Sequence, residues 1–312
     1  MITGQYRILS NGIELARADN VITTLGKRSI LRYLAGLDSS FAGAIGVGCS
    51  ASIPNSPSVD DIHLGFEFAR APVTVTSVDY SNQDVIFKAT LPTGQAGKVY
   101  EMGLFTYLDN KEAGAFSSKL LSSCGSSELW TATPSALAYD TTNYRVGPEA
   151  LLADITTSSG TQTFTSSVRF NLAGYSYTDE FGLAFVTYYN YIENIQVKFT
   201  NSSGTTMVGT FTPASHTAGT NVAQMQLVKL SKLSFTNSSS DWSEIVTLQI
   251  LVTAKSSASA TNRGKVAVDG LRVYDNDTIS SQYSLVSRAA VTPVTKVAST
   301  PLDLEYRLRF SL

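Results

Sequence analysis

Histidine, a common general base and metal ligand, occurs at only two positions in this sequence, His63 and His216. Neither belongs to an H-x-x-x-H or H-x-x-E-H pattern, so paired-histidine metal ligation is not indicated. The sequence also lacks a G-x-S-x-G motif, a P-loop and a dinucleotide-binding glycine motif between a strand and a helix. We therefore interpret both histidines as surface or loop-packing residues.

A pair of carboxylates could hydrolyse a glycosidic bond, and β-rich proteins often do this chemistry. No spacing selects a pair from the candidates, and most of them fall in predicted turns, where Asp forms local hydrogen bonds. The sequence therefore predicts a protein that is not an enzyme. The candidates weighed are Asp140, Glu149, Asp154, Asp179, Glu180, Asp241, Glu244, Asp269, Asp275 and Asp277.

Asp269 differs from these because it sits inside an apolar run, VAVDGL at 266–271. A carboxylate in such a strand needs a partner or an ion. The sequence DND at 275–277 begins like a calcium loop, but it lacks the following Gly and the distal Glu of an EF-hand. An end-of-strand turn is the preferred interpretation there, and no cofactor is expected.

Tyr188, Tyr189 and Tyr191 form the densest aromatic cluster of the chain. Exposed aromatic rings can stack on sugars or contact a partner, and the alternative is that these side chains face the core or the sheet. Glu101 and Arg70 lie in apolar strands, where an unpaired charge is costly. We expect them to pair with each other or with other buried polar groups; the alternative is that each points to solvent.

The composition points to assembly rather than to nucleic acid or membrane. Charged residues make up 15% of the chain, against roughly 25% in ordinary domains, and the net charge is −2. A chain of this charge does not predict the basic surface that binds nucleic acid. No stretch approaches the roughly 18 apolar residues of a membrane span, and the first residues do not resemble a signal peptide. We expect synthesis in the cytoplasm and unbridged Cys49 and Cys124, with a disulfide between them as the alternative.

The elements that must position these residues are almost all strands. One helix is predicted before residue 36, with Thr23 or Thr24 as N-cap, Ile30, Leu31 and Leu34 on one face, and Gly36 after its end. Asn11-Gly12 predicts a hairpin between strands at 5–10 and 13–18. A second hairpin is predicted between 72–78 and 84–91. Seven further strands are predicted in the middle of the chain, at 166–172, 182–188, 195–200, 208–211, 225–230, 245–254 and 266–274.

The C-terminal residues alternate strictly, with Leu302, Leu304, Tyr306, Leu308, Phe310 and Leu312 on one face. This pattern predicts a long half-buried strand, which needs a sheet to join. We assign it to the sheet of the first 120 residues, so that the middle segment is an insertion. The predicted fold is all-β: a small mixed β domain of residues 1–122 with 282–312, carrying one helix, and an inserted jelly-roll β-sandwich of residues 123–281. Two domains in series with a C-terminal arm are the alternative.

An ordered series of segments on both sides of the insertion resembles tail-fibre and baseplate-associated structural proteins of tailed bacteriophages. The segments are NVITTLGK at 20–27, IGVG at 45–48, LGFEFARAPV at 64–73, YEMGLF at 100–105 and SRAAVTPVTK at 287–296. The resemblance implies a virion location, other virion proteins as partners, and self-association. A trimer is the first expectation for a fibre-like role.

The middle segment resembles a concanavalin-like or carbohydrate-binding jelly roll through NYRVGPEAL at 143–151, SYTDEF at 176–181 and VAVDGL at 266–271. In such modules the carboxylate of the last strand can lie near a structural calcium, and Asp269 is the matching position. The expected function is therefore that of a non-enzymatic phage structural protein at the tail, baseplate or fibre attachment. The alternatives are an adhesin that binds a host-surface glycan, and a capsid or neck decoration protein.

Overall fold

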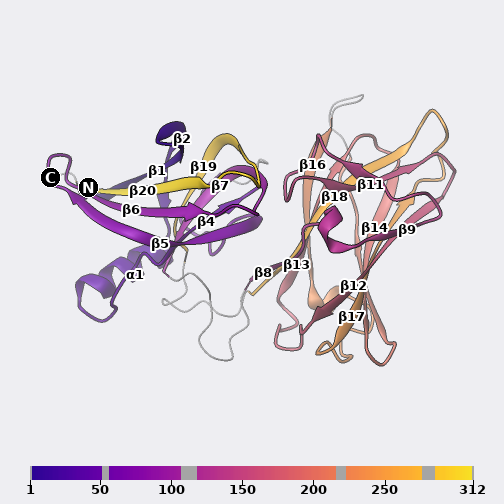
Figure 1. The fold of residues 1–312 in the computed structure, drawn as a ribbon. Helices are drawn as coiled ribbons and strands as arrows, with labels where there is room; N and C mark the ends of the chain where they lie inside the picture. The colour runs from indigo at the N-terminus through magenta and orange to yellow at the C-terminus, as the bar shows by residue number, and fades with distance from the viewer. Residues whose placement is uncertain (1, 51–55, 107–117, 216–222, 276–284, 311–312) are drawn as a thin grey trace. The chain divides into compact units, whose positions relative to one another are not determined.

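The computed structural model describes residues 2–50, 56–106, 118–215, 223–275 and 285–310. The regular structure is almost all β-strand, with one α-helix and two single 3₁₀ turns in the described ranges (Figure 1). The chain divides into two compact units: Met1–Glu112 with Thr278–Leu312, and Ala113–Asp277. His216 and Asp277 lie outside the described residues.

The first unit is a nine-stranded antiparallel sheet in the order β2-β1-β20-β6-β5-β4-β7-β19-β3. The two strands from the C-terminal segment, β19 and β20, lie within the sheet of the N-terminal strands. The bounds are β1 (Ile2–Ser10), β2 (Ile13–Asp19), β3 (Val21–Ile22), β4 (Ala44–Gly48), β5 (Glu67–Asp79), β6 (Asp84–Leu91), β7 (Gly97–Phe105), β19 (Leu285–Lys296) and β20 (Leu302–Phe310).

The two ends of this sheet come from one stretch of chain, because β2 and β3 are separated by a single residue, Asn20. β2 pairs with β1 and β3 pairs with β19, so the sheet curls into a ring. Alternate side chains of the strands fill its interior, as the period of two predicts for β20 from Leu302 to Leu308; Phe310, predicted on the same face, is 38% exposed because the strand ends there. Tyr6 and Tyr306 are fully buried there, and the Tyr6 hydroxyl contacts Ser287 Oγ at 2.7 Å.

The helix, α1 (Thr24–Leu34), begins as predicted: the Thr23 side chain accepts a hydrogen bond from the Gly26 N–H at 2.8 Å. It ends before Gly36, whose positive φ of 70° favours glycine. The predicted apolar face needs correction, because Ile30 is buried while Leu31 and Leu34 are each 66% exposed. The helix packs instead through Gly26, Ser29 and Ile30, since two of these are small enough for close approach.

The hairpin predicted from Asn11-Gly12 is confirmed, and both residues have the positive φ that a type I′ turn requires. The second hairpin is also confirmed, as β5 and β6 pair directly across the 80–83 turn. Cys49 and Cys124 are both buried and form no disulfide, as expected.

The second unit is a sandwich of two antiparallel sheets, which we call the six-stranded and five-stranded sheets. The first has the order β10-β11-β18-β13-β16, with β8 also paired to β18; the second has the order β15-β14-β17-β12-β9. Their bounds are β8 (Lys119–Ser122), β9 (Thr131–Thr133), β10 (Tyr139–Asp140), β11 (Ala150–Ile155), β12 (Thr161–Phe170), β13 (Glu180–Thr187), β14 (Ile192–Asn201), β15 (Thr206–Phe211), β16 (Gln224–Ser231), β17 (Ile245–Ala254) and β18 (Gly264–Tyr274).

The core of the sandwich lies between the two sheets and is rich in aromatic rings. Phe181 stacks on Trp242, with centroids 5.8 Å apart, and lies 5.0 Å from Phe235 and 5.5 Å from Phe199. The sequence placed residues 119–122 in the first domain. This boundary is wrong, because β8 pairs with residues 271–273 of β18 and so belongs to the second unit.

Within the part of the chain that the structure describes, no helix is long and apolar enough to cross a membrane.

Candidate functional site

The outer face of the six-stranded sheet carries two half-buried tyrosines, Tyr144 and Tyr188. They pack on a floor of three small or branched side chains, Ala150, Val186 and Ala267, whose chain neighbours Leu151, Phe185 and Val268 point into the core. We call this group the tyrosine face. Because side chains alternate along a strand, the floor residues are held on the side opposite the core.

Tyr188 is the best-defined member of the tyrosine face. Its hydroxyl accepts a hydrogen bond from the Asn143 side-chain amide at 3.0 Å. The Lys265 ammonium lies 4.5 Å from the ring centroid, and the Tyr188 backbone N–H donates to the Lys265 carbonyl at 3.2 Å. These contacts fix the ring orientation before any ligand arrives.

The loop that carries Asn143 and Tyr144 is held by two carboxylates. Asp140 accepts the backbone N–H groups of Thr142 at 2.8 Å and Asn143 at 3.0 Å. Asp269, fully buried, accepts the N–H of Val146 at 3.2 Å and also that of Arg145. Charged acceptors make such hydrogen bonds stronger than neutral ones. The loop is therefore tied to the sheet on both sides of Tyr144.

A β-bulge explains where the Asp269 side chain points. In the register between β13 and β18, Ala184 faces Gly270 and Phe185 faces Val268, so Asp269 has no residue opposite it. A bulge of this kind turns one side chain out of the regular alternation. Here it places Asp269 on the outer face beneath the loop at 140–148.

A polar pair lies on the same face of the sheet. Asp154 faces Lys265 in the β11–β18 register and binds the Arg263 guanidinium through both carboxylate oxygens, with Nε at 2.7 Å from Oδ1. Arg263 is 45% exposed and Asp154 27% exposed. Planar groups of this type can hydrogen-bond hydroxyls of a ligand.

The three tyrosines of the predicted aromatic cluster lie in different places in the structure. Tyr188 lies on the tyrosine face, whereas Tyr191 packs against the sandwich core, and Tyr189 is half-buried without belonging to either cluster. Asn143 and Tyr144 belong to the segment 143–151 that carries the resemblance to carbohydrate-binding jelly rolls, but neither was predicted as a site residue, and Lys265 was missed. The one available signal was Asp140 three residues before Asn143, a spacing typical of a loop held by an Asp side chain.

No three His, Cys, Asp or Glu side chains gather into a group that could hold a metal ion in the described ranges. Asp269 is held by the backbone amides of residues 145 and 146. A structural calcium at Asp269 stays a prediction, because the other ligands that it would need are not found among those residues.

Glu101 and Arg70 have buried partners but are not paired with each other. Glu101, 1% exposed, binds the Arg288 guanidinium at 2.7 Å and accepts the N–H groups of Gly65 at 3.0 Å and Phe66 at 2.9 Å. Burial alone lowers the pKa of Arg288, but the charges of Glu101 and Asp61 outweigh it and raise that pKa.

Arg70 binds Glu67 through two hydrogen bonds of 2.7 and 2.8 Å, and its guanidinium carbon lies 3.5 Å from the Phe105 ring centroid. We interpret the contacts of Arg70 and Glu101 as structural: they stabilise the fold of the first unit.

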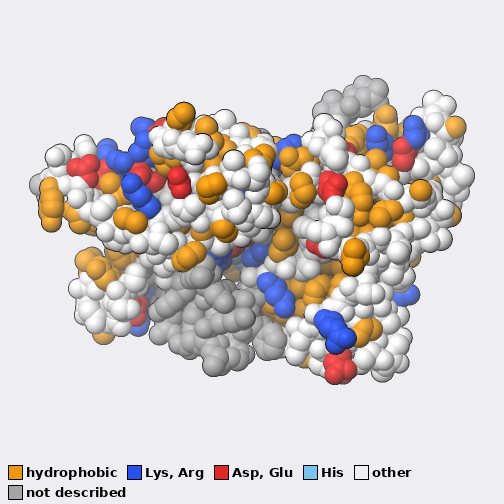
Figure 2. Space-filling view, viewed as in Figure 1, with side chains coloured by type: hydrophobic (Ala, Val, Ile, Leu, Met, Phe, Trp, Pro, Cys, Tyr) orange, Lys and Arg blue, Asp and Glu red, His pale blue; other side chains and the backbone are white. Residues whose placement is uncertain are grey.

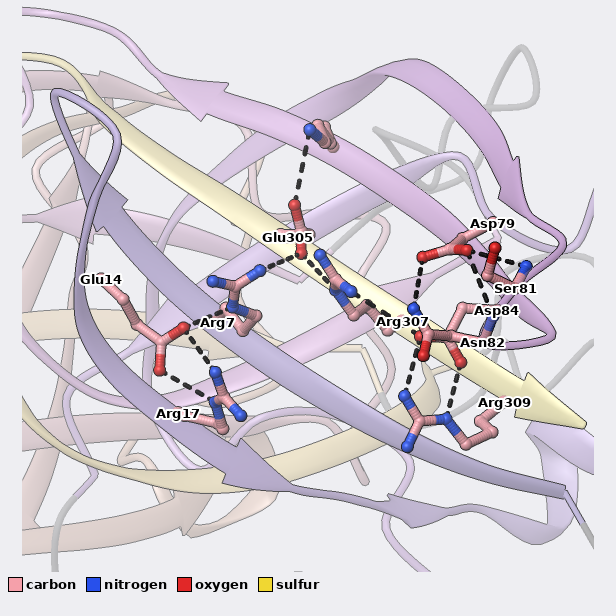
Figure 3. A network of polar contacts seen from close by, with 11 residues as sticks. Arg7, Glu14, Arg17, Asp79, Ser81, Asn82, Asp84, Glu305, Arg307 and Arg309 are labelled. Carbon is pink, nitrogen blue, oxygen red and sulfur yellow. Dashed lines mark hydrogen bonds and ion pairs between the residues drawn. The ribbon is translucent and has the colours of Figure 1, made fainter. Parts of the chain in front are cut away.

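The outer face of β1, β20 and β6 carries a second polar arrangement, the ion-pair ladder. Figure 3 shows Arg7 between two carboxylates, Glu14 and Glu305. The Arg7 guanidinium lies 2.5 Å from Glu14 and 3.0 Å from Glu305. Asp84, fully buried, binds Arg309 at 2.8 Å. Figure 2 shows acidic and basic side chains gathered over these strands. Nearly every charge of the ladder is paired with an opposite charge. The ladder is therefore better explained by a structural role than by ligand binding.

No protein-family model and no curated protein matches the chain. Among solved structures, it is similar to the family 11 carbohydrate-binding module of a cellulosomal cellulase of Clostridium thermocellum, at 14% identity and TM-score 0.35, over 52% of this chain and 96% of that one. It is similar to a carbohydrate-binding module specific for non-crystalline cellulose, at 17% identity and TM-score 0.35, over 53% and 97%.

A third similar structure is the glycoside hydrolase domain of Endo-D from Streptococcus pneumoniae R6, at 13% identity and TM-score 0.33. The match covers 48% of this chain and 22% of that one. TM-scores this low carry no functional argument, so the function must be argued from the residues of the site.

Proposed function

We propose that the second unit binds a glycan chain on the tyrosine face. The observation that supports this is the pair Tyr144 and Tyr188, two partly exposed rings that both pack on Ala150, Val186 and Ala267. The C–H face of a sugar ring is weakly apolar and stacks on aromatic rings, while its hydroxyls need hydrogen-bonding groups at the edge.

The binding groups are fixed in advance, which reduces the entropy lost on binding. Asn143 holds the Tyr188 hydroxyl, and Asp269 and Asp140 hold the loop that carries Asn143. In this proposal Asp269 positions the site without touching the ligand. Arg263 and Asp154 supply hydrogen-bonding groups at the edge of the face.

The test is binding of the full chain to an immobilised panel of bacterial and plant glycans. The variant Tyr188→Ala should lower the affinity for any retained glycan by up to roughly tenfold, because an aromatic contact contributes about 0.5–1.5 kcal/mol. Tyr80→Ala is the matched control, because Tyr80 is 88% exposed in the β5–β6 turn of the first unit. Equal loss in both variants, or no glycan retained by the unchanged chain, would contradict the proposal.

A second proposal concerns the first unit, to which we assign a role in virion assembly at a tail, baseplate, fibre or neck position, without enzymatic activity. The sequence series at 20–105 and 287–296 supports it. So does the exposure of Leu31, Leu34 and Leu37, each 66%, at the end of α1. Exposed apolar side chains close together are typical of protein contact surfaces. Self-association, with a trimer first, is part of this proposal.

Light scattering of the purified chain tests self-association, and electron microscopy of virions tests location. A strictly monomeric chain at high concentration would argue against a homo-oligomer. Absence of the protein from purified particles would reject the virion role, while leaving the glycan proposal intact.

A further inference from the structure

The ring of the first unit is incomplete at one place, between β1 and β3. The pairing of β1 with β2 continues to Gly4, whose carbonyl accepts the Asn20 N–H at 3.1 Å. With Gln5 opposite Asp19, the same register would next place Ile2 opposite Ile22. Instead β3 turns to β19, where Ile22 faces Ser287, and no β1–β3 pairing is found among the described strands. We call the resulting gap the notch.

Backbone groups on both walls point into the notch. The Thr23 N–H donates to the Val286 carbonyl at 3.0 Å, so the alternation of an antiparallel pair directs the N–H and C=O of Ile22 away from β19. The same alternation, counted from the Gly4 carbonyl, directs those of Ile2 toward the notch. Unpaired strand edges of this kind are templates for another extended chain.

The notch coincides with a half-open surface hollow of about 590 Å³, a volume within the roughly 300–1,000 Å³ range of ligand pockets. Its charged lining residues are Lys27, Asp19, Asp84, Arg307 and Arg309. Asp84 is already bound by Arg309, and Asp19 accepts a hydrogen bond from Gln5 at 3.1 Å. Lys27 has no ion pair among the described residues, so it is the cation left for a ligand.

Asn20, at the closed end of the notch, adds a further sign of incompleteness. Its Nδ2 donates to the Tyr306 hydroxyl at 3.0 Å, but its buried Oδ1 finds no hydrogen-bond partner in the described ranges. A buried acceptor without a donor costs about 1–3 kcal/mol. The Asn20 amide group lies beside Gly4 and the buried Tyr306 hydroxyl, on the interior side of the ring.

We propose that the notch binds the carboxy-terminal end of an extended peptide, as an added short strand. The backbone of the peptide would pair with the free edges of Ile2 and Ile22, and its terminal carboxylate would lie against Lys27. Pairing with the main chain of a peptide would use the peptide groups that both walls present. Lys27, the cation without an ion pair, would bind the terminal carboxylate of that peptide. The site is in the first unit and does not depend on glycan binding by the second.

The probe is a mixture of N-acetylated tetrapeptides randomised at every position, added to the full chain as free acids or as carboxy-terminal amides. Backbone amide chemical shifts of Thr3, Ile22 and Lys27 should move with the free acids. The amides should bind roughly tenfold more weakly, the size of one charge-assisted hydrogen bond.

The variant Lys27→Ala should reduce the response to the free acids to the level of the amides. Arg28→Ala is the matched control, because Arg28 is the next residue of α1, is exposed, and does not line the notch. Shifts that are equal for acids and amides would overturn the assignment of the carboxylate to Lys27. No shift at Thr3 and Ile22 with either mixture would overturn the proposal as a whole.

Discussion

The two units satisfy their polar groups in different ways. In the first, carboxylates are buried against arginines: Asp84 is fully buried and Glu305 is 4% exposed, each bound by at least two cations. In the second, the outer face of the five-stranded sheet is lined by hydroxyl and amide groups. Gln249 donates to Thr165 at 3.1 Å, and Thr161 contacts Thr253 at 3.2 Å.

The difference shows where each unit is vulnerable. Buried ion pairs add little net stability but are costly to break, since the remaining charge is left without a partner. Neutral hydroxyl pairs carry a smaller penalty, so the second unit depends mainly on its aromatic core. Both tryptophans, Trp130 and Trp242, lie in the second unit, so tryptophan fluorescence reports on that unit alone.

The largest effect should come from deleting residues 301–312. β20 lies between β1 and β6 in the middle of the sheet, and Leu302, Leu304, Tyr306 and Leu308 are at most 3% exposed. Their burial contributes roughly 1.5–3 kcal/mol each, which together reaches the whole stability of about 5–15 kcal/mol of a typical domain. Hydrogen exchange should show the first unit unprotected while tryptophan fluorescence of the second stays native. An unchanged first unit would mean that β20 is dispensable.

Phe181→Ala should destabilise the second unit and leave the first unit unchanged. Phe181 is fully buried against three other aromatic rings of the second unit, and such a truncation costs about 3–5 kcal/mol. The urea midpoint followed by tryptophan fluorescence should fall, with no change in hydrogen exchange of β1 and β20. A matching loss in the first unit would show that the two units unfold together.

Glu101→Gln should destabilise the first unit by a few kcal/mol, at most roughly 3–5 kcal/mol, because buried Arg288 is left with Asp61 as its single carboxylate partner. Asp154→Asn removes the half-exposed pair with Arg263 in the second unit and serves as the control, at about 1 kcal/mol or less. Urea unfolding followed by hydrogen exchange measures both. Equal effects would remove the distinction between buried and exposed ion pairs.

Acid should affect the first unit more than the second. Arg17 and Arg7 lower the pKa of Glu14 to about 2. Burial raises the pKa of Glu305, but Arg307 and Arg7 outweigh it and lower that pKa. A depressed folded-state pKa gives stability that is present above the unfolded value of about 4.3 and is lost as the pH falls toward 2.

Unfolding temperatures at pH 7, 4 and 2.5 should therefore fall mainly for the first unit, and Glu14→Gln should reduce that fall. Parallel losses in both units would contradict the role of the ion-pair ladder.

The sequence predicted the parts of this fold that local pattern determines. The alternation at 302–310 predicted β20, and Asn11-Gly12 predicted a turn that needs two positive φ angles. The face of α1 was not predictable in the same way. Ile30, Leu31 and Leu34 have similar hydrophobicity, and only the tertiary position of the helix decides that Leu31 stays exposed.

The candidate site was predicted only in part for a related reason. Tyr188 and Asp269 stood out from the sequence as an aromatic cluster and as a charge in an apolar strand. Their connection runs through the loop at 140–148, and the resemblance of its sequence to carbohydrate-binding jelly rolls did not single out Asn143 or Tyr144 as site residues. The bulge that directs Asp269 to this loop is a matter of register between β13 and β18, which no local pattern encodes.

The position of β20 also has a consequence for the order of folding. Synthesis proceeds from the N-terminus, so β1 and β6 are made long before the strand that belongs between them, with the whole second unit made in the interval. The second unit is continuous in sequence and can complete its core while the first still waits for β20. Until then the facing edges of β1 and β6 are unpaired, and such edges attract other chains. During synthesis, aggregation should therefore begin at the first unit.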